Sequence, residues 1–215
     1  MPLLRLVGVD ATYRGQARAW TRSLLACGVV GPALFVAAFL VDGASRSSYS
    51  QLRDYVSELS FGTGGWIQTA NFIICGWLVL AFAAGLSRVS GNDVGSASAP
   101  ALISMLGLGL IGAGTFGTDP IGSPATLHGD LHFLATIAIA GALSATCLIL
   151  VPAIDNVSSS TWRRISVLTG FVVPALFLLS NVAPPFLLPG LVERAALILG
   201  AGWVATLASR VLRRM

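Results

Sequence analysis

The sequence predicts an all-α membrane protein, a polytopic bundle of six transmembrane helices. Three observations indicate this class. Hydrophobic residues make up 55% of the 215 residues, charged residues make up 10%, and the mean hydropathy is +0.81, whereas soluble domains carry about a quarter charged residues. Apolar runs of membrane-spanning length recur along the chain, and almost all charged residues lie between these runs.

The apolar runs define the predicted helices in order. About 20 apolar residues in a helix span the roughly 30 Å hydrocarbon layer of a bilayer. The six runs cover residues 23–41, 67–86, 99–117, 131–151, 165–182 and 191–209. Because the connections are short, we expect one transmembrane domain over residues 22–210, with a cytoplasmic N-terminal segment over 1–21 and a cytoplasmic tail over 211–215.

The first run is expected to remain in the mature protein. It is longer than the roughly 7–15 apolar residues of a signal-peptide core. Asp42 also stands just after it, where a cleavage site needs a small residue. We therefore expect an uncleaved first helix.

The arginines predict the orientation of the helices. The chain has no lysine, and ten of its 13 arginines lie on the side of both termini. The other side has Arg46, Arg53 and Arg194. Short arginine-rich segments stay in the cytoplasm, so we expect both termini inside a bacterial-type cell membrane. The positive charge then reflects topology and contact with lipid headgroups, and no motif indicates a nucleic-acid partner.

The three cysteines give no sign of a disulfide framework. Cys27, Cys75 and Cys147 all lie inside apolar runs, and no Cys-x-x-Cys pair occurs. An odd number of cysteines without a loop cysteine does not form such a framework. We interpret them as small hydrophobic residues of the helix packing.

Glycine is concentrated in the third apolar run. Gly109, Ala113 and Gly117 recur every four residues, a spacing that lets another helix backbone approach closely. We expect this stripe to pack against a neighbouring helix. We also expect the third helix to be central in the bundle.

Polar residues gather at the loops opposite the termini. These loops cover residues 42–65, 118–132 and 183–194, and they contain both histidines and six of the nine carboxylates of the chain. Ionisable groups at membrane depth pair with each other or face a wet cavity. We therefore expect a ligand-binding cluster for a lipid headgroup, small molecule or ion, formed by Ser57, Glu58, Asp119, His128, His132 and Arg194.

His128 and His132 are the most specific pair in this cluster. A spacing of four residues places both imidazoles on one face of a helix, where two histidines can share a metal ion. Asp119 would join them as a ligand of a divalent metal such as zinc. Glu58 and Asp119 are the candidates for a catalytic base.

A structural interpretation competes with the metal site. The histidines would hydrogen-bond the carboxylates and pin the loops together. Asp119 would then end a helix, because Pro120 follows it. Ser57 and Glu58 would begin a short interfacial helix in the first outer loop.

The order of the motifs resembles a known family of bacterial and archaeal six-helix membrane proteins, domain of unknown function 998. The motifs are Tyr49-x5-Tyr-Val-Ser-Glu-Leu59, Asn71-Phe72, Gly112-Ala-Gly-Thr-Phe-Gly-Thr-Asp119-Pro120, His128-Gly-Asp-Leu-His132, Gly190-Leu-Val-Glu-Arg194 and Trp203. The resemblance covers about residues 22–213. It implies the six-helix fold and no particular activity. It also implies that eight residues are important: Ser57, Glu58, Asp119, Pro120, His128, His132, Glu193 and Arg194.

Three function classes follow, in order of preference. The first is binding of a ligand, lipid headgroup or ion at the outer cluster, or a structural latch there. The second is a metal-dependent intramembrane hydrolase, in which a metal-activated water attacks a lipid ester, amide or phosphoester. The third is a small transporter or a membrane assembly factor. The chain has no internal repeat and no pair of matching broken helices, the features typical of many transporters.

Overall fold

The computed structural model describes residues 3–90, 94–120, 122–153, 160–182, 186 and 188–215, with the backbone alone for 3–14, 94–97 and 150–153. This part of the chain is all-α, and no strand occurs in it. The elements are α1 (Leu3–Ser45), the short 3-10 helix η1 (Val56–Ser60), α2 (Gly65–Val89), α3 (Val94–Thr115), α4 (Leu127–Ala153), α5 (Ser160–Val182) and α6 (Pro189–Leu212).

The six α-helices are each long and apolar enough to cross a membrane, which confirms the predicted fold class. Five of the predicted runs lie wholly inside a helix, and the run 99–117 continues two residues past the end of α3 at Thr115. Only helices satisfy every backbone hydrogen bond within one segment in lipid. Large apolar side chains such as Leu108, Phe171 and Leu178 are exposed on the outside of the bundle, as a lipid-facing surface requires.

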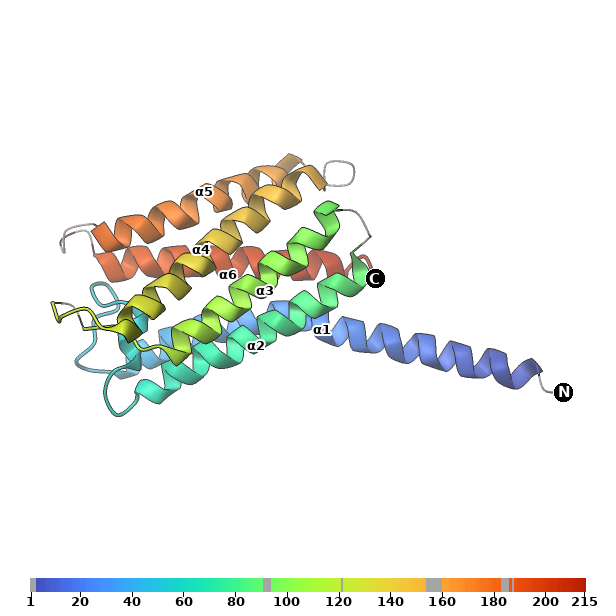
Figure 1. Ribbon diagram of the computed structural model, residues 1–215, viewed down its shortest axis with the longest axis horizontal. Coiled ribbons are helices and arrows are strands. Elements are labelled where there is room, and N and C mark those ends of the chain that lie inside the picture. Colours follow the sequence, from blue (N-terminus) through green and yellow to red (C-terminus); the bar gives the residue numbers. More distant parts are fainter. Residues whose placement is uncertain (1–2, 91–93, 121, 154–159, 183–185, 187) are drawn as a thin grey trace.

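The first helix is much longer than its apolar run. α1 has 43 residues, which corresponds to about 65 Å at a rise of 1.5 Å per residue. Its N-terminal part projects beyond the other helices at the end of the bundle where the C-terminus lies (Figure 1). Helix therefore continues through the segment 1–21 from Leu3 onward, although the apolar run begins only at residue 23.

The helices form a closed ring in sequence order. Each helix packs on the next one along the chain, and α6 packs on α1 (Figure 1). The interior of the ring is mostly apolar, with fully buried side chains that include Phe39, Phe82 and Ile103, and the polar side chain of Gln68 is also fully buried. Cys75 and Cys147 are also buried in the core, in agreement with their prediction as small hydrophobic residues.

Glycine lets α3 approach both of its neighbours. A Cβ atom on Gly107 would lie 2.9 Å from the carbonyl oxygen of Gly76 on α2, and one on Gly109 would lie 2.7 Å from Ile139 on α4. Ala113 is buried, so two members of the predicted stripe pack as expected. Gly117 lies beyond the end of α3, where a Cβ would meet nothing within 4 Å.

The expectation that α3 is the central helix is wrong. It forms one wall of the ring between α2 and α4, and Met105 and Leu108 on its outer face are exposed. The glycines reflect two close helix contacts rather than a central position.

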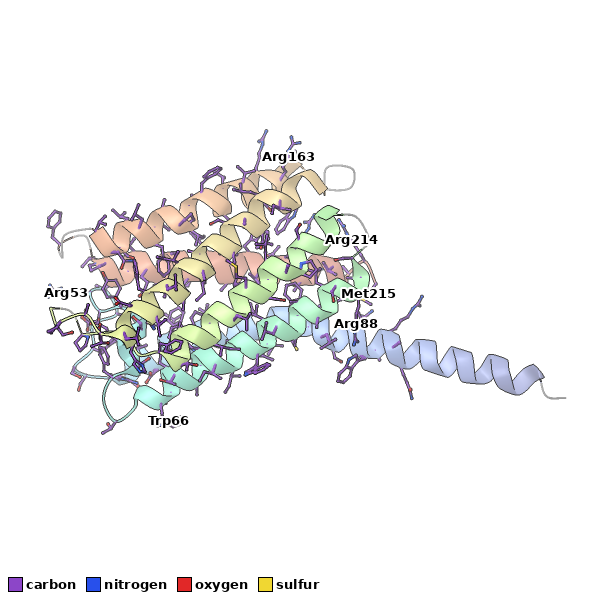
Figure 2. All side chains as sticks on the ribbon, in the orientation of Figure 1. Arg53, Trp66, Arg88, Arg163, Arg214 and Met215 are labelled. Carbon is purple, nitrogen blue, oxygen red and sulfur yellow. The ribbon has the colours of Figure 1, made fainter. Side chains whose placement is uncertain are left out.

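The two ends of the ring differ in charge and structure. Arg88, Arg163 and Arg214 lie at the end with the C-terminus, and Arg53 lies at the opposite end (Figure 2). That opposite end carries η1, the segment that follows α3, the end of α5 and the start of α6 (Figure 1). The arginine asymmetry is thus a property of the folded bundle, and the cytoplasmic location of both termini stays a prediction.

Candidate functional site

Arg194 links the first outer loop, residues 42–65, to the start of α6. Its guanidinium donates hydrogen bonds to the backbone oxygens of Asp54, at 2.8 Å, and Gly190, at 2.9 Å. It also donates to the hydroxyl oxygen of Tyr49 and lies over the Tyr49 ring, 5.3 Å from its centroid. Burial raises the pKa of the Tyr49 hydroxyl to about 12, so this hydroxyl stays protonated and donates to the Tyr55 oxygen at 2.9 Å.

Close backbone contacts also join the first outer loop to the start of α6, and we call this contact region the junction. The Leu191 N–H donates to the Leu52 oxygen at 3.0 Å. Gly190 faces the loop so closely that a Cβ on it would lie 2.4 Å from the Asp54 oxygen. The Gly190-Leu-Val-Glu-Arg194 motif therefore packs against the loop segment that begins at Tyr49.

Glu193 on α6 binds the backbone of η1. One of its carboxylate oxygens accepts a hydrogen bond from the Val56 N–H at 2.6 Å, and its side chain is only 8% exposed. Its other oxygen has no hydrogen-bond partner among the described residues. The buried carboxylate thus retains an open acceptor.

Glu58 shapes the start of η1. Its carboxylate accepts a hydrogen bond from the Tyr55 N–H at 2.8 Å. A short helix begins here as predicted, although Tyr55 and not Ser57 stands at its N-cap, and its place at the membrane interface stays a prediction. Burial raises the pKa of the Glu58 carboxyl above its usual value, and the neighbouring Asp54 charge adds to this effect. The Tyr55 hydroxyl donates to the Ser180 oxygen on α5 at 2.6 Å.

Asp119 organises the start of α4. It accepts hydrogen bonds from the Thr126 N–H at 2.8 Å and the Thr126 hydroxyl at 2.7 Å, and these bonds lower the pKa of its carboxyl. The Thr126 hydroxyl oxygen in turn accepts from the Gly129 N–H at 3.2 Å, as an N-cap residue does. A Cβ on Gly129 would lie 2.0 Å from Asp119 Oδ2, so a larger residue there would displace the Asp119 carboxylate.

His132 joins α4 to the end of α3. Its Nδ1 lies 3.0 Å from the Ala113 oxygen and 2.9 Å from the Phe116 oxygen. Both partners are carbonyl acceptors, so Nδ1 carries the proton and donates. When the ring is neutral, Nε2 is unprotonated and accepts hydrogen bonds. This nitrogen has no hydrogen-bond partner in the part of the chain that is described. The side chain is 6% exposed.

His128 has a different environment from His132. It is exposed in the first turn of α4, and its ring contacts the Phe116 ring at a centroid distance of 5.8 Å. Among the described residues, no group of three His, Cys, Asp or Glu side chains has an arrangement that could hold a metal ion. The pair therefore shares a helix with one imidazole buried and the other exposed.

A cavity of about 130 Å³ lies between η1, the α3–α4 connection and the ends of α4, α5 and α6. We call it the outer cavity. It brings together four of the predicted site residues, Ser57, Glu58, Asp119 and His132. His128 and Arg194 do not line it. The other lining residues are Tyr55, Thr118, Gly129, Phe133, Thr136, Phe177, Asn181 and Glu193.

The outer cavity has an acidic wall. Glu58, Asp119 and Glu193 supply three carboxyl groups, and His132 is the sole basic side chain among the lining residues. The guanidinium of Arg194, the residue next to Glu193, donates to backbone oxygens and Tyr49 instead. The arrangement suits a ligand group that is positively charged or donates hydrogen bonds.

The ligand-binding residues predicted from the sequence did not include Glu193 or Tyr55, which line the outer cavity. Glu193 was implied only by the family resemblance, and its neighbour Arg194 was assigned to the ligand instead. One signal could have separated them. On a helix that begins near residue 189, Glu193 and Leu197 share a face one turn apart, and Leu197 belongs to the apolar interior.

A comparison with known protein families gives a match over most of the chain. Residues 29–210 match the family described as a protein of unknown function, DUF998. The chain belongs to this family. The match covers α2 to α5 completely and reaches into α1 and α6. All residues that line the outer cavity therefore lie within the DUF998 region. Searches of curated proteins and of solved structures found no match.

Proposed function

We propose that this membrane protein binds a small ligand through a positively charged, hydrogen-bond-donating group held in the outer cavity. One observation carries the proposal. Two side chains that are more than nine-tenths buried, Glu193 and His132, each present an unpartnered acceptor atom and line the same cavity. These atoms are one carboxylate oxygen of Glu193 and Nε2 of His132.

The chemistry of the two acceptor atoms favours a bound cation. Neither is fully enclosed by protein, because the fully enclosed partnerless side-chain atoms among the described residues are Gln68 Nε2 and Arg194 Nε, so a ligand can reach both acceptor atoms. An ammonium group has three donors and a positive charge, so it satisfies a carboxylate and a neutral imidazole together. Glu58 and Asp119 add two further carboxyl groups to the lining.

Binding of ethylammonium tests the proposal. The protein in lipid nanodiscs is titrated with ethylammonium chloride by calorimetry, with sodium acetate and ethanol as matched probes of opposite or no charge. We expect saturable binding of ethylammonium alone. Binding of acetate in its place, or no binding of any of the three, would contradict the proposal.

A pair of carboxyl variants locates the site. Glu58→Gln removes a charge from the cavity wall and keeps an oxygen that accepts from the Tyr55 N–H. Asp130→Asn removes a charge from the same end of the molecule, but Asp130 does not line the cavity. We expect Glu58→Gln to weaken ethylammonium binding by about tenfold, in line with the free energy of one charged hydrogen bond. Asp130→Asn should leave the affinity unchanged.

A further inference from the structure

A second cavity lies inside the helix ring, below the outer cavity. Its volume is about 60 Å³, and all six α-helices contribute to its lining. Representative lining residues, one from each helix in order, are Phe35, Val79, Leu110, Leu143, Phe177 and Val204. The lining side chains are apolar, and a cavity of this kind stays dry and accepts apolar groups. We call it the central cavity.

The two cavities are adjacent, because one residue lines both of them. Phe177 on α5 lines both of them. Asn181 lies one turn further out on the same face of α5, and it lines the outer cavity only. The polar cavity therefore gives way to the apolar one within a single helical turn, about 5.4 Å.

The same change from polar to apolar occurs on α4 and α6. On α4, Thr136 lines the outer cavity and Ala140, four residues on, lines the central cavity. On α6, Glu193 lines the outer cavity and Leu197 lines the central cavity. Residues four apart share a helix face, so three adjacent helices present a continuous strip that is polar outside and apolar inside.

We propose that the ligand is a single-chain amphiphile with a cationic headgroup. The headgroup occupies the outer cavity, and the alkyl chain passes Phe177 into the central cavity. This inference rests on the proposed function, because it assigns the chain that accompanies the charged group. The acidic wall selects the headgroup, and the apolar ring interior selects the chain.

A series of n-alkylammonium ions tests the assignment of the chain. Ethyl-, butyl-, hexyl- and octylammonium chlorides are titrated into the protein in nanodiscs, and partition into empty nanodiscs is measured and subtracted. Burial of one methylene group strengthens binding about fourfold. We expect affinity to rise by this factor over part of the series and then to level off, because the central cavity has a volume of only about 60 Å³.

Filling the central cavity separates chain binding inside the ring from partition into lipid. Ala140→Leu places a larger side chain in the cavity, and Ala175→Leu makes the same change on an exposed face of α5. We expect Ala140→Leu to remove the dependence on chain length while ethylammonium still binds. Ala175→Leu should bind the whole series as the unchanged protein does. Ala201→Leu fills the same cavity from α6 and replaces Ala140→Leu if that variant does not fold.

The outcomes distinguish the two proposals. Ethylammonium binding with no gain from longer chains would leave the proposed function standing and overturn the amphiphile. A chain-length dependence that survives in both Ala140→Leu and Ala201→Leu would also overturn it, because the chain would then lie in lipid. Failure of every member of the series to bind would overturn both proposals.

Discussion

Glu193 and Val56 are linked across 137 residues of sequence by a hydrogen bond of 2.6 Å between a buried carboxylate and a backbone N–H. This bond ties η1 to α6 and forms part of the wall of the outer cavity. The same carboxylate thus holds the loop with one oxygen, while its other oxygen has no hydrogen-bond partner among the described residues.

Replacement of Glu193 separates these two roles. Glu193→Ala leaves the Val56 N–H without an acceptor, so we expect a loss of about 1–3 kcal/mol in the free energy of unfolding. Glu193→Gln keeps an oxygen acceptor and should lose less stability, while it removes the charge that a cation needs. Chemical denaturation in detergent measures the first effect, and equal losses in both variants would contradict the hydrogen bond.

Arg194→Lys tests the junction of the first outer loop. A lysine ammonium cannot reproduce the fork of a guanidinium, which here serves the oxygens of Asp54, Gly190 and Tyr49. We expect a loss of about 1.5–3 kcal/mol, the contribution of a charged hydrogen bond, together with faster proteolysis of the loop. Arg53→Lys is the matched control, because Arg53 is exposed. Equal proteolysis of the two variants would count against the junction.

Gly190→Ala tests the close approach of α6 to the loop. The added Cβ would lie 2.4 Å from the Asp54 oxygen, which belongs to the backbone and cannot move aside alone. We expect a loss of about 1–3 kcal/mol from overpacking. Gly141→Ala on α4 is the control, since a Cβ there meets nothing within 4 Å, and it should be neutral or stabilising by about 0.5–1 kcal/mol. A lower melting temperature for Gly141→Ala than for Gly190→Ala would refute this packing.

Asp119 and Glu58 should affect stability with opposite signs as the pH falls. The folded-state pKa of Asp119 is lowered by Thr126, with a smaller effect of His128. Its contribution is therefore present above the ordinary aspartate value of about 3.9 and is lost as the pH falls through the lowered pKa. The folded-state pKa of Glu58 is raised by burial, and the charge of Asp54 raises it further. Its contribution is therefore present below the ordinary glutamate value and is lost as the pH rises through the raised pKa.

Melting temperatures across the acid range test these signs. Compared with the unchanged protein, Asp119→Asn should lose less stability on acidification, and Glu58→Gln should lose more. The Tyr55 N–H and the Glu193 carboxylate near Glu58 remain in both variants. Parallel pH profiles for all three proteins would contradict the assignment.

The sequence predicted the transmembrane helices well because their signal is local. An apolar run reports its own length and burial in lipid, as residues 67–86 and 165–182 do. The predicted length of the first helix was too short, since helix continues to Leu3 beyond the apolar run. The position of α3 was wrong because glycines mark a close contact without naming how many neighbours a helix has.

The candidate site was predictable in part. Ser57, Glu58, Asp119 and His132 line the outer cavity, and their role in binding stays a prediction. The histidine spacing gave a shared helix face, and it could not give depth. The start of α4 at Leu127 leaves His128 in an exposed first turn, and the last carbonyls of α3 bury His132 one turn later.

The contacts between the first outer loop and α6 could not be predicted from the sequence. Arg194 donates to the backbone of Asp54, and Glu193 accepts from the backbone of Val56. Backbone groups are present at every residue, so neither partner leaves a mark in the residue types. A charge in the first turns of a predicted helix indicates a contact without identifying the segment that makes it.

The nitrogen resonances of His132 give the most direct test of the proposed binding. His128 and His132 are the two histidines of the chain, so His128→Gln leaves one imidazole, and ¹⁵N-histidine labelling then reports His132 alone. The account predicts a protonated Nδ1, an unprotonated Nε2, and a saturable shift of the Nε2 resonance on addition of ethylammonium that is lost in the Glu193→Gln background. An Nε2 resonance that stays unchanged at saturating ethylammonium would contradict the proposed site.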